Sequence, residues 1–279
     1  MRFMPQVPIT GIAGWRFLER TQASQQAAFE KGPELQRDIA YFEERIGTIT
    51  SAADLVADRR LLKVALGAFG MESEIDKRAF LRKVLDEGTT DPKAFANRLT
   101  DPAYRKFAET FGFGNAGGAR TNEAGFAARI VAAYKTRAFE AAVGQSDNNM
   151  RLAMNFRREM AELSAGEGAS WFTVLGSQPL REVFEKAFGL PRQFGQIDVD
   201  RQHDIMRDKA AALFGSGGSL AAFQDPAAVE RVLNRFLARA QMEGGIAPTT
   251  RGSAALSLLQ ASQDADASQG LFNLLASRG

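Results

Sequence analysis

Apolar residues recur along this chain at the spacing of a helix. In one stretch they are Phe80, Leu81, Val84 and Leu85, and the stretch 229–237 repeats the spacing. Positions three and four apart share one face of an α-helix, whereas strands alternate with a period of two and favour β-branched residues. Alanine, leucine, arginine, glutamate and glutamine fill the long segments, and these residues favour helices. The pattern therefore predicts an all-α fold.

The expected helices follow from this periodicity and from capping residues at the ends of each stretch. They cover roughly 14–30, 33–47, 51–69, 73–87, 91–98, 101–112, 121–143, 147–164, 178–188, 198–214, 225–242 and 250–261. Their ends are uncertain by about two to four residues. The prediction is a multi-helix array.

Three of the helical segments share one way of ending. Segments 60–71, 102–113 and 179–190 each end in Phe-Gly followed by an apolar residue. A glycine just past a helix takes the left-handed conformation that a side chain disfavours, and the next apolar residue packs back onto the last turn. Two of the segments begin with proline, which suits the first position of a helix. The pattern predicts three short helices with similar closures.

The similarity continues beyond these helices. Segment 60–71 is followed by Ile-Asp, a helix ending in glycine, and an Asp-Pro helix start, and so is segment 179–190. One interpretation is a degenerate internal duplication of about 51–113 and 170–240, separated by two long helices. The other is that Phe-Gly and Asp-Pro are common helix punctuation. Both interpretations remain open at the level of sequence.

Two glycine-rich breaks indicate how the chain is divided. The segment 112–125 reads as a loop between two packed helical lobes, and 244–248 reads as a second break. The predicted organisation is an extended N-terminal arm at 1–13, an N-terminal lobe at 14–118, a C-terminal lobe at 119–245 and a partly helical tail at 246–279. The tail is expected either to move freely or to dock on a partner.

The N-terminal arm carries apolar residues in a stretch that proline and glycine keep from being helical. It is expected either to wrap the protein's own core or to engage another protein. The candidate partner-binding residues are Phe3, Val7, Ile9, Trp15 and Phe17.

Composition excludes several classes of function. The 279 residues include 35 basic and 33 acidic residues and no cysteine. Interleaved charges with a formal net charge of +2 do not form the basic face of a nucleic-acid-binding protein. Without cysteine there are no disulfides, thiolate nucleophiles or Cys-ligated metals, and one histidine excludes His–His metal motifs. We therefore expect no catalytic residue, no metal and no cofactor.

The sequence also bears on location. No run of 18 apolar residues occurs, so no membrane-spanning helix is expected. The N-terminus lacks the apolar core of a secretory signal. The expected location is the cytoplasm, or outside it after export without a cleaved signal. The oligomeric state does not follow from the sequence.

Two motifs resemble functional sites by letter only. Gly112 to Gly117 reads G-x-G-x-x-G, but it follows a helix, whereas a dinucleotide site needs the loop between a strand and a helix. His203 lies among Asp198, Asp200 and Asp204, where the better interpretation is a solvated acidic first turn that suits the helix dipole. The 21 phenylalanines are expected mainly in the core, for example Phe80, Phe107, Phe184 and Phe236.

Three stretches carry a resemblance to a known family. Residues 55–71, 79–88 and 91–99, with a later block at 179–202, resemble the bacterial family defined by domain of unknown function 1217, over roughly 10–260. The resemblance implies an all-helical protein with no assigned activity, often encoded among flagellar genes. It adds association with the flagellum to the expected locations. It carries over no catalytic or ligand-binding residue.

The leading functional hypothesis is a non-enzymatic interaction or structural protein of the bacterial flagellar system, such as an assembly factor, an accessory or an export substrate. Its partners would be other proteins, including flagellar components. The alternative is a small-ligand-binding protein or enzyme with a pocket between the helical lobes. The residues available for that alternative are Arg78, Arg82, Arg201, His203 and Asp204.

Overall fold

The computed structural model describes residues 3–166 and 170–243, and all regular structure in them is helical. The α-helices are α1 (Gly11–Glu30), α2 (Pro33–Arg45), α3 (Ala52–Ala57), α4 (Arg59–Gly67), α5 (Arg78–Glu87), α6 (Pro102–Phe111), α7 (Phe126–Gly144), α8 (Asn148–Ala165), α9 (Trp171–Gly176), α10 (Gln178–Phe188), α11 (Val199–Phe214) and α12 (Pro226–Glu243). The 3-10 helices are η1 (Ile46–Thr48), η2 (Glu72–Glu74), η3 (Phe95–Arg98), η4 (Arg192–Gln196), η5 (Ser216–Gly218) and η6 (Leu220–Gln224). The predicted all-α fold is confirmed.

The helix expected at 51–69 is instead two helices, α3 and α4. Asp58 stands between them with an extended backbone (φ −91°, ψ 101°). Its carboxylate accepts hydrogen bonds from the backbone N–H groups of Arg60 at 2.9 Å and Leu61 at 3.1 Å. The hydroxyl of Tyr41 donates to the same carboxylate at 2.6 Å. Asp58 therefore ends one helix and caps the next, because its side chain satisfies N–H groups that the new helix leaves free.

Other expected boundaries also differ. Helix α9 was not expected, and the helix expected at 91–98 is only the 3-10 helix η3. The helix expected from 121 begins at Phe126. Thr121 lies in the loop before it, where its buried hydroxyl donates a hydrogen bond to the backbone carbonyl of Ile49 at 2.6 Å. Helix α1 begins at Gly11, so the end of the expected arm is helical. The helix expected at 250–261 lies outside the described residues.

Two parts of the chain repeat one order of elements. Each begins with a serine whose side chain accepts a backbone hydrogen bond, Ser51 from Asp54 at 3.1 Å and Ser170 from Phe172 at 3.2 Å. A helix of six residues follows in both, and then a single residue in nearly the same conformation. That residue is Asp58 (φ −91°, ψ 101°) in the first unit and Ser177 (φ −92°, ψ 105°) in the second.

The second helix of each unit closes in the same way. Gly70 (φ 73°) and Gly189 (φ 66°) are left-handed. The N–H after each glycine reaches back five residues, from Met71 to the Leu66 carbonyl at 3.0 Å and from Leu190 to the carbonyl of residue 185 at 2.9 Å. This is the Schellman closure that the Phe-Gly pattern predicted. The third Phe-Gly segment, at the end of α6, closes with the simpler single bond of a left-handed cap.

The later parts of the two units match as well. Gly88 ends α5 (φ 65°, ψ −150°), and Gly215 ends α11 (φ 73°, ψ −146°). Asp101 (φ −77°, ψ 117°) precedes α6, and Asp225 (φ −77°, ψ 114°) precedes α12. Both aspartates accept a hydrogen bond from the N–H two residues on, at 2.8 Å and 2.9 Å. These matches agree with the predicted duplication, here α3 to α6 and α9 to α12.

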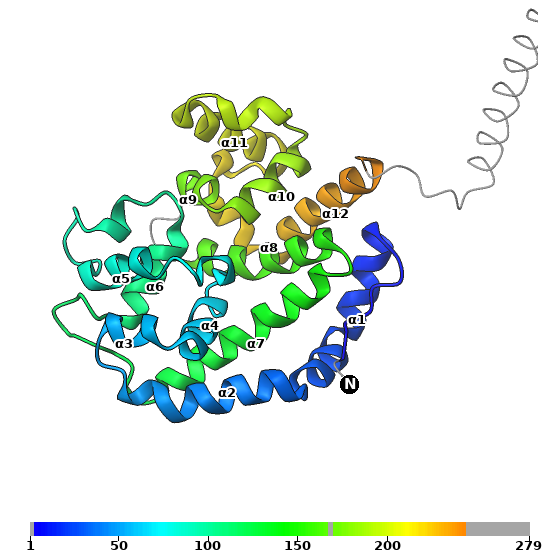
Figure 1. The fold of residues 1–279 in the computed structure, drawn as a ribbon. Helices are drawn as coiled ribbons and strands as arrows, with labels where there is room; N and C mark the ends of the chain where they lie inside the picture. Colours follow the sequence, from blue (N-terminus) through cyan, green and yellow to red (C-terminus); the bar gives the residue numbers. More distant parts are fainter. Residues whose placement is uncertain (1–2, 167–169, 244–279) are drawn as a thin grey trace, which may run out of the picture.

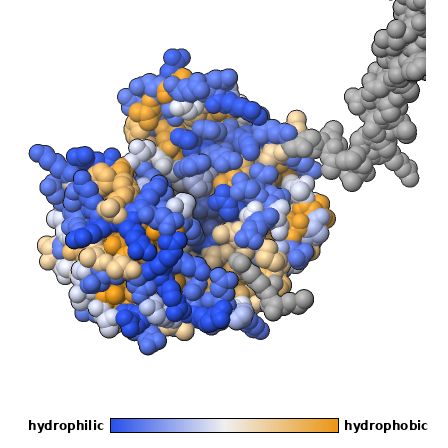
Figure 2. All heavy atoms as spheres, viewed as in Figure 1, coloured by the Kyte–Doolittle hydropathy of each residue, from blue (hydrophilic) through white to orange (hydrophobic). Residues whose placement is uncertain are grey.

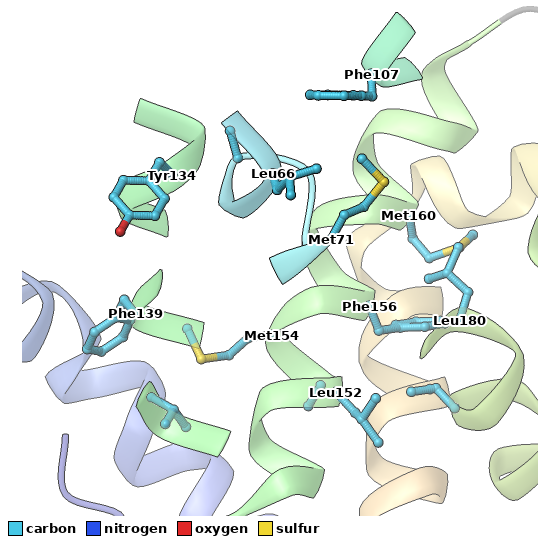
Figure 3. Close-up of a cluster of buried hydrophobic side chains, with 14 of the residues drawn as sticks. Leu66, Met71, Phe107, Tyr134, Phe139, Leu152, Met154, Phe156, Met160 and Leu180 are labelled. Carbon is cyan, nitrogen blue, oxygen red and sulfur yellow. The ribbon is translucent and has the colours of Figure 1, made fainter. Parts of the chain in front are cut away.

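Helices α7 and α8 join the two units. Helix α7 contacts α2 and α4, helix α8 contacts α10 and α12, and α1 packs on α12, α7 and α8. Figure 1 shows α3 to α6 and α9 to α11 as two groups of helices connected by the long helices α7 and α8. The main cluster of buried side chains runs through all of these elements. In Figure 3, Phe156 of α8 lies against Leu180 of α10, while Met154 of α8 points toward Phe139 of α7.

Aromatic side chains form much of this core, as predicted. Phe107, Phe184 and Phe236 are fully buried. Phe80 is half-buried and belongs to a smaller cluster, where its ring packs edge-on against Phe95 at 5.3 Å between centroids. Edge-to-face pairs of this kind stabilise the packing beyond the burial of area alone.

Candidate functional site

A cleft opens between the two repeated units above α7 and α8. Its volume is 470 Å³, within the range of roughly 300–1,000 Å³ that is typical of ligand sites. One wall comes from the turn after α4 and the start of α6, and the other comes from α9 and the start of α10. In Figure 2 a hollow near the centre of the molecule is bordered by hydrophilic side chains. Both units and both long helices therefore contribute to one concave surface.

The residues that define the repeat in the sequence also line this cleft. Phe69 and Gly70 belong to the closure of α4, Asp101 and Pro102 start α6, and Pro179 lies at the start of α10. The sequence pattern thus located part of the walls, although it did not predict that they face one another. The floor comes from polar residues of α7 and α8, which carry no motif.

The floor of the cleft is held by buried ion pairs between α7 and α8. Glu140 is 5% exposed, and its two carboxylate oxygens accept hydrogen bonds from Arg158, both at 2.8 Å. Glu159 accepts from Arg158 at 2.6 Å and from Arg137 at 2.8 Å. Burial raises the pKa of Glu159, but Arg137, Arg158 and Lys106 outweigh it and lower the pKa below its ordinary value. These charges are therefore matched within the protein.

Two carboxyl groups on the wall of the first unit are not matched in this way. Among the described residues, neither Glu72 nor Asp101 forms an ion pair with lysine or arginine. Glu72 is exposed, yet the surrounding protein partly desolvates its carboxyl and raises the pKa, against the opposing effects of a backbone hydrogen bond and of Arg137 and Arg151. Burial likewise raises the pKa of Asp101, against the effect of its cap hydrogen bond. For both groups the effect of burial exceeds the opposing effects, so each pKa lies above its ordinary value.

The floor also holds a polar atom without a partner. The side-chain oxygen of Asn155, on α8, is buried and accepts no hydrogen bond from the described residues. Most buried polar atoms in proteins have a partner, so each exception needs an explanation. Asn155 therefore gives the floor a buried acceptor without a partner among the described residues, whereas Asp101 on the wall accepts its cap hydrogen bond.

Cations also border the cleft. Lys106 pairs with Glu162, and Arg151 donates from Nε to the side-chain oxygen of Asn148 at 2.9 Å. Arg105 is exposed at the rim. The cleft is therefore lined by charges of both signs, with Glu72 and Arg105 exposed and Asp101 and Arg151 half-buried.

The candidate partner-binding residues of the N-terminal arm lie elsewhere. Phe3 and Val7 pack against the core, and Phe17 is half-buried. Trp15 is 2% exposed and is therefore a core residue, not a surface anchor. Ile9 is 54% exposed. Partner binding by the arm stays a prediction, and Ile9 is the member of the set that a partner reaches directly.

Hydrogen bonds fix the arm to its own protein. The N–H of Gln6 donates to the side-chain oxygen of Gln25 at 2.7 Å, and the Gln25 amide donates back to the Gln6 carbonyl at 3.1 Å. The hydroxyl of Ser146, before α8, donates to the Pro5 carbonyl at 3.4 Å. This packing corresponds to the self-wrapping alternative of the sequence interpretation.

The residues proposed for a pocket between lobes do not line the cleft. Arg78 and Arg82 lie on α5, and Arg201, His203 and Asp204 lie on α11. The His203 ring stacks on the half-exposed Phe172 ring at 4.5 Å between centroids, and its Nδ1 lies 3.2 Å from the Asp204 carboxylate. The structure separates these residues into two places, because α5 and α11 occupy equivalent positions in different units.

The G-x-G-x-x-G segment is a helix cap and a loop, as expected. Gly112 ends α6 in the left-handed conformation. The Asn115 side-chain oxygen accepts from the N–H of Thr89 at 2.7 Å and from the hydroxyl of Thr90 at 3.1 Å, so the loop braces the chain after α5. In the described part of the chain no helix is long and apolar enough to span a membrane, and no cluster of three potential metal ligands occurs.

The fold and the cleft together define an all-α protein in which two helical units with the same order of elements pack on two long helices. Within this class the chain belongs to the family described as protein of unknown function (DUF1217), whose model matches residues 68–229. The resemblance predicted from sequence is confirmed, over a shorter stretch than expected.

A solved structure shows the same fold. The crystal structure of protein AGR_C_984 from Agrobacterium tumefaciens is 28% identical, with a TM-score of 0.71. The match covers 86% of this chain and 99% of that one. No curated protein matches the chain.

Proposed function

We propose that this protein is a non-enzymatic interaction protein that binds its partner in the cleft between the two repeated units. The observation that carries the proposal is the joint construction of the cleft, with walls from both units and a floor held by buried ion pairs. A concave surface on rigid elements with unused polar groups is the usual form of a binding site.

The partner is proposed to be a component of the bacterial flagellar system, in which this protein would be an assembly factor, an accessory or an export substrate. The family resemblance supports this part of the proposal. Deleting the gene is expected to impair swimming or filament assembly. Normal swimming together with normal filaments would refute the flagellar assignment and leave the cleft as a binding site for another partner.

A steric block tests binding in the cleft itself. Ala141 is an exposed residue of α7 that lines the cleft. Ala132 is also exposed on α7 but does not line it. The two positions point in opposite directions, because nine residues turn an α-helix by about two and a half revolutions. Ala132→Trp is therefore the control for Ala141→Trp, because both replace an exposed alanine of α7 with tryptophan and only Ala141 faces the cleft.

The measurement is affinity capture from flagellated cells, with mass spectrometry of the captured proteins. Ala132→Trp is expected to capture the same flagellar components as the parent protein, and Ala141→Trp is expected to lose them. Equal capture by both variants, each with an unchanged circular dichroism spectrum, would overturn the proposal.

The second candidate function is a small-ligand-binding protein or enzyme that uses the same cleft. The raised pKa of Glu72 and of Asp101 favours it, since perturbed carboxyls in clefts are frequent at functional sites. A metabolite that raises the melting temperature of the parent protein but not that of Ala141→Trp would support this candidate. Affinity capture by Ala141→Trp should then recover the same proteins as the parent.

A further inference from the structure

The two repeated units touch each other directly at one edge of the cleft. Gly176, the last residue of α9, packs against the backbone carbonyl of Thr100, in the loop before α6. Neither residue lines the cleft, but their neighbours do: Asp101 and Pro102 follow Thr100 on the first wall, and Ser177 follows Gly176 on the second. The contact therefore joins the two walls from outside the surface that a partner would touch.

Most other packing of the two units is indirect. Helices of the first unit pack mainly on one another and on α2 and α7, and helices of the second unit pack mainly on one another and on α1 and α8. The position of one wall relative to the other thus depends on α7 and α8 beneath the cleft and on the contact between Gly176 and Thr100 at its edge.

The contact leaves no room for a side chain at position 176. An added Cβ would overlap the carbonyl oxygen of Thr100, which belongs to the backbone and cannot turn aside as the end of a flexible side chain can. Carbon makes its ordinary contacts at roughly 3.5 Å, so relief of the overlap requires the two backbones to separate by about 1 Å. Glycine is needed here for the close approach of the two backbones.

The first unit shows that the local backbone does not itself require glycine. Ala57 occupies the equivalent place, as the last residue of α3, and is exposed. The residues that follow, Asp58 (φ −91°, ψ 101°) and Ser177 (φ −92°, ψ 105°), have nearly the same conformation. Gly176 itself has no positive φ. The contact between the units, and not local conformation, therefore explains the glycine.

We infer that Gly176 is a positioning residue of the cleft: by packing against the Thr100 carbonyl, it sets the separation of the two walls that the partner recognises. The inference rests on the proposed function, because it concerns the same cleft. Substitution of Gly176 should thus change binding although its side chain does not reach the partner.

Gly176→Ala and Gly176→Val insert side chains of increasing size into the contact. Two controls match them. In Gly195→Ala the added Cβ meets nothing within 4 Å, and Ala57→Val changes the equivalent, exposed end of α3. Alanine favours a helix more than glycine does, so a loss in Gly176→Ala reflects the contact with Thr100 and not helix propensity.

The separation of the units is measured by pulsed electron paramagnetic resonance. The chain has no cysteine, so the exposed residues Ala79 of α5 and Ala212 of α11 can be changed to cysteine and spin-labelled specifically. Gly176→Ala is expected to lengthen the mean distance between the labels by about 1 Å, and Gly176→Val by more. Gly195→Ala and Ala57→Val are expected to leave it unchanged. An unchanged distance in both Gly176 variants would overturn the inference, because the overlap would then be relieved within one loop.

Binding is measured by affinity capture from flagellated cells. Gly176→Ala and Gly176→Val, each with an unchanged circular dichroism spectrum, are expected to capture about tenfold less of the flagellar components than the parent, since a binding site displaced by about 1 Å loses its complementarity. Both controls are expected to capture like the parent. Full capture by both Gly176 variants, with loss of capture in Ala141→Trp, would refute the positioning role and retain the cleft as the partner site.

The two proposals fail separately. If the label distance lengthens in Gly176→Ala while this variant and Ala141→Trp both capture the parent's proteins in full, the partner does not bind in the cleft, and Gly176 still sets the separation of the walls. If the label distance stays constant while Ala141→Trp loses capture, the partner site stands and the role of Gly176 is refuted.

Discussion

Glu140 keeps a full hydrogen-bonded ion pair where almost no water reaches it. Its side chain is 7% exposed and that of Arg158 is 19% exposed, and two bonds of 2.8 Å join them. The pair connects α7 to α8 beneath the cleft. Burial disfavours the charged form of Arg158, but Glu140 and Glu159 outweigh burial and raise its pKa. The pair is therefore expected to matter for stability as well as for the shape of the floor.

Glu140→Gln is expected to lower the free energy of unfolding by about 3 kcal/mol. The substitution leaves the Arg158 guanidinium with Glu159 as its one carboxylate partner, and it places the new amide N–H group against the N–H donors of Arg158. Urea denaturation followed by circular dichroism measures the change. Glu162→Gln is the control, since its pair with Lys106 is half-exposed and should cost only ~0.5 kcal/mol. Equal losses in the two variants would show that the buried pair has no special role.

The sequence could identify some of the site residues and not others. Asp101, Gly70 and Pro179 belong to local patterns, because a cap or a closure depends on residues next to it in the chain. Glu72, Glu140 and Arg158 have no such pattern. Glu140 and Arg158 are 18 positions apart, and only the packing of α7 on α8 makes them partners. The burial of Trp15 has no local pattern either, because it depends on contacts with α8 and α12.

At the scale of elements, the closures of α4 and α10 are the most constrained local features. A side chain added at Gly189 (φ 66°) would place its Cβ 2.5 Å from the Arg239 guanidinium, which is the mobile end of a long side chain. The main cost of Gly189→Ala is therefore the left-handed backbone. The expected loss is about 1–2 kcal/mol in the free energy of unfolding.

Gly195→Ala serves as the comparison for Gly189→Ala. Gly195 also lies in the second unit, in η4, but nothing lies within 4 Å of an added Cβ and its φ is not positive. Its substitution is expected to change stability by less than ~0.5 kcal/mol. A loss at Gly195 as large as that at Gly189 would contradict the role of the left-handed closure.

Elements with strong local signals were predictable, and short ones were not. Helices α8, α10 and α12 begin and end within about one residue of the expected positions, because caps and periodicity agree there. The break between α3 and α4 lies at Asp58, inside a continuous helical pattern of apolar residues, and the Asp58 carboxylate also accepts a hydrogen bond from Tyr41 of α2. Helix α9 is six residues long, too short for a helical period to be distinct.

At the scale of the whole molecule, one core unites the two repeated units. Buried residues of α4, such as Leu62 and Leu66, belong to the same cluster as Phe156 of α8 and Phe184 of α10. The Phe156 and Phe184 rings meet edge-on at 5.0 Å between centroids. Periodicity predicted which faces would be buried, but it could not predict that α7 and α8 would share their core with both units. The division into lobes at 14–118 and 119–245 stays a prediction.

This shared core leads to an expectation about cooperativity. If α7 and α8 couple the two units, opening one unit exposes the core of the other, so both should unfold in a single step. Native-state hydrogen exchange measures this in α4 and α10, whose central residues Val64 and Val183 are fully buried. The slowest amides of both helices are expected to exchange with the same free energy of opening, equal to that of global unfolding. Glu140→Gln should lower both values equally, because the Glu140–Arg158 pair lies between the units. A lower opening free energy in one helix alone, unaffected by Glu140→Gln, would instead identify two lobes that unfold independently.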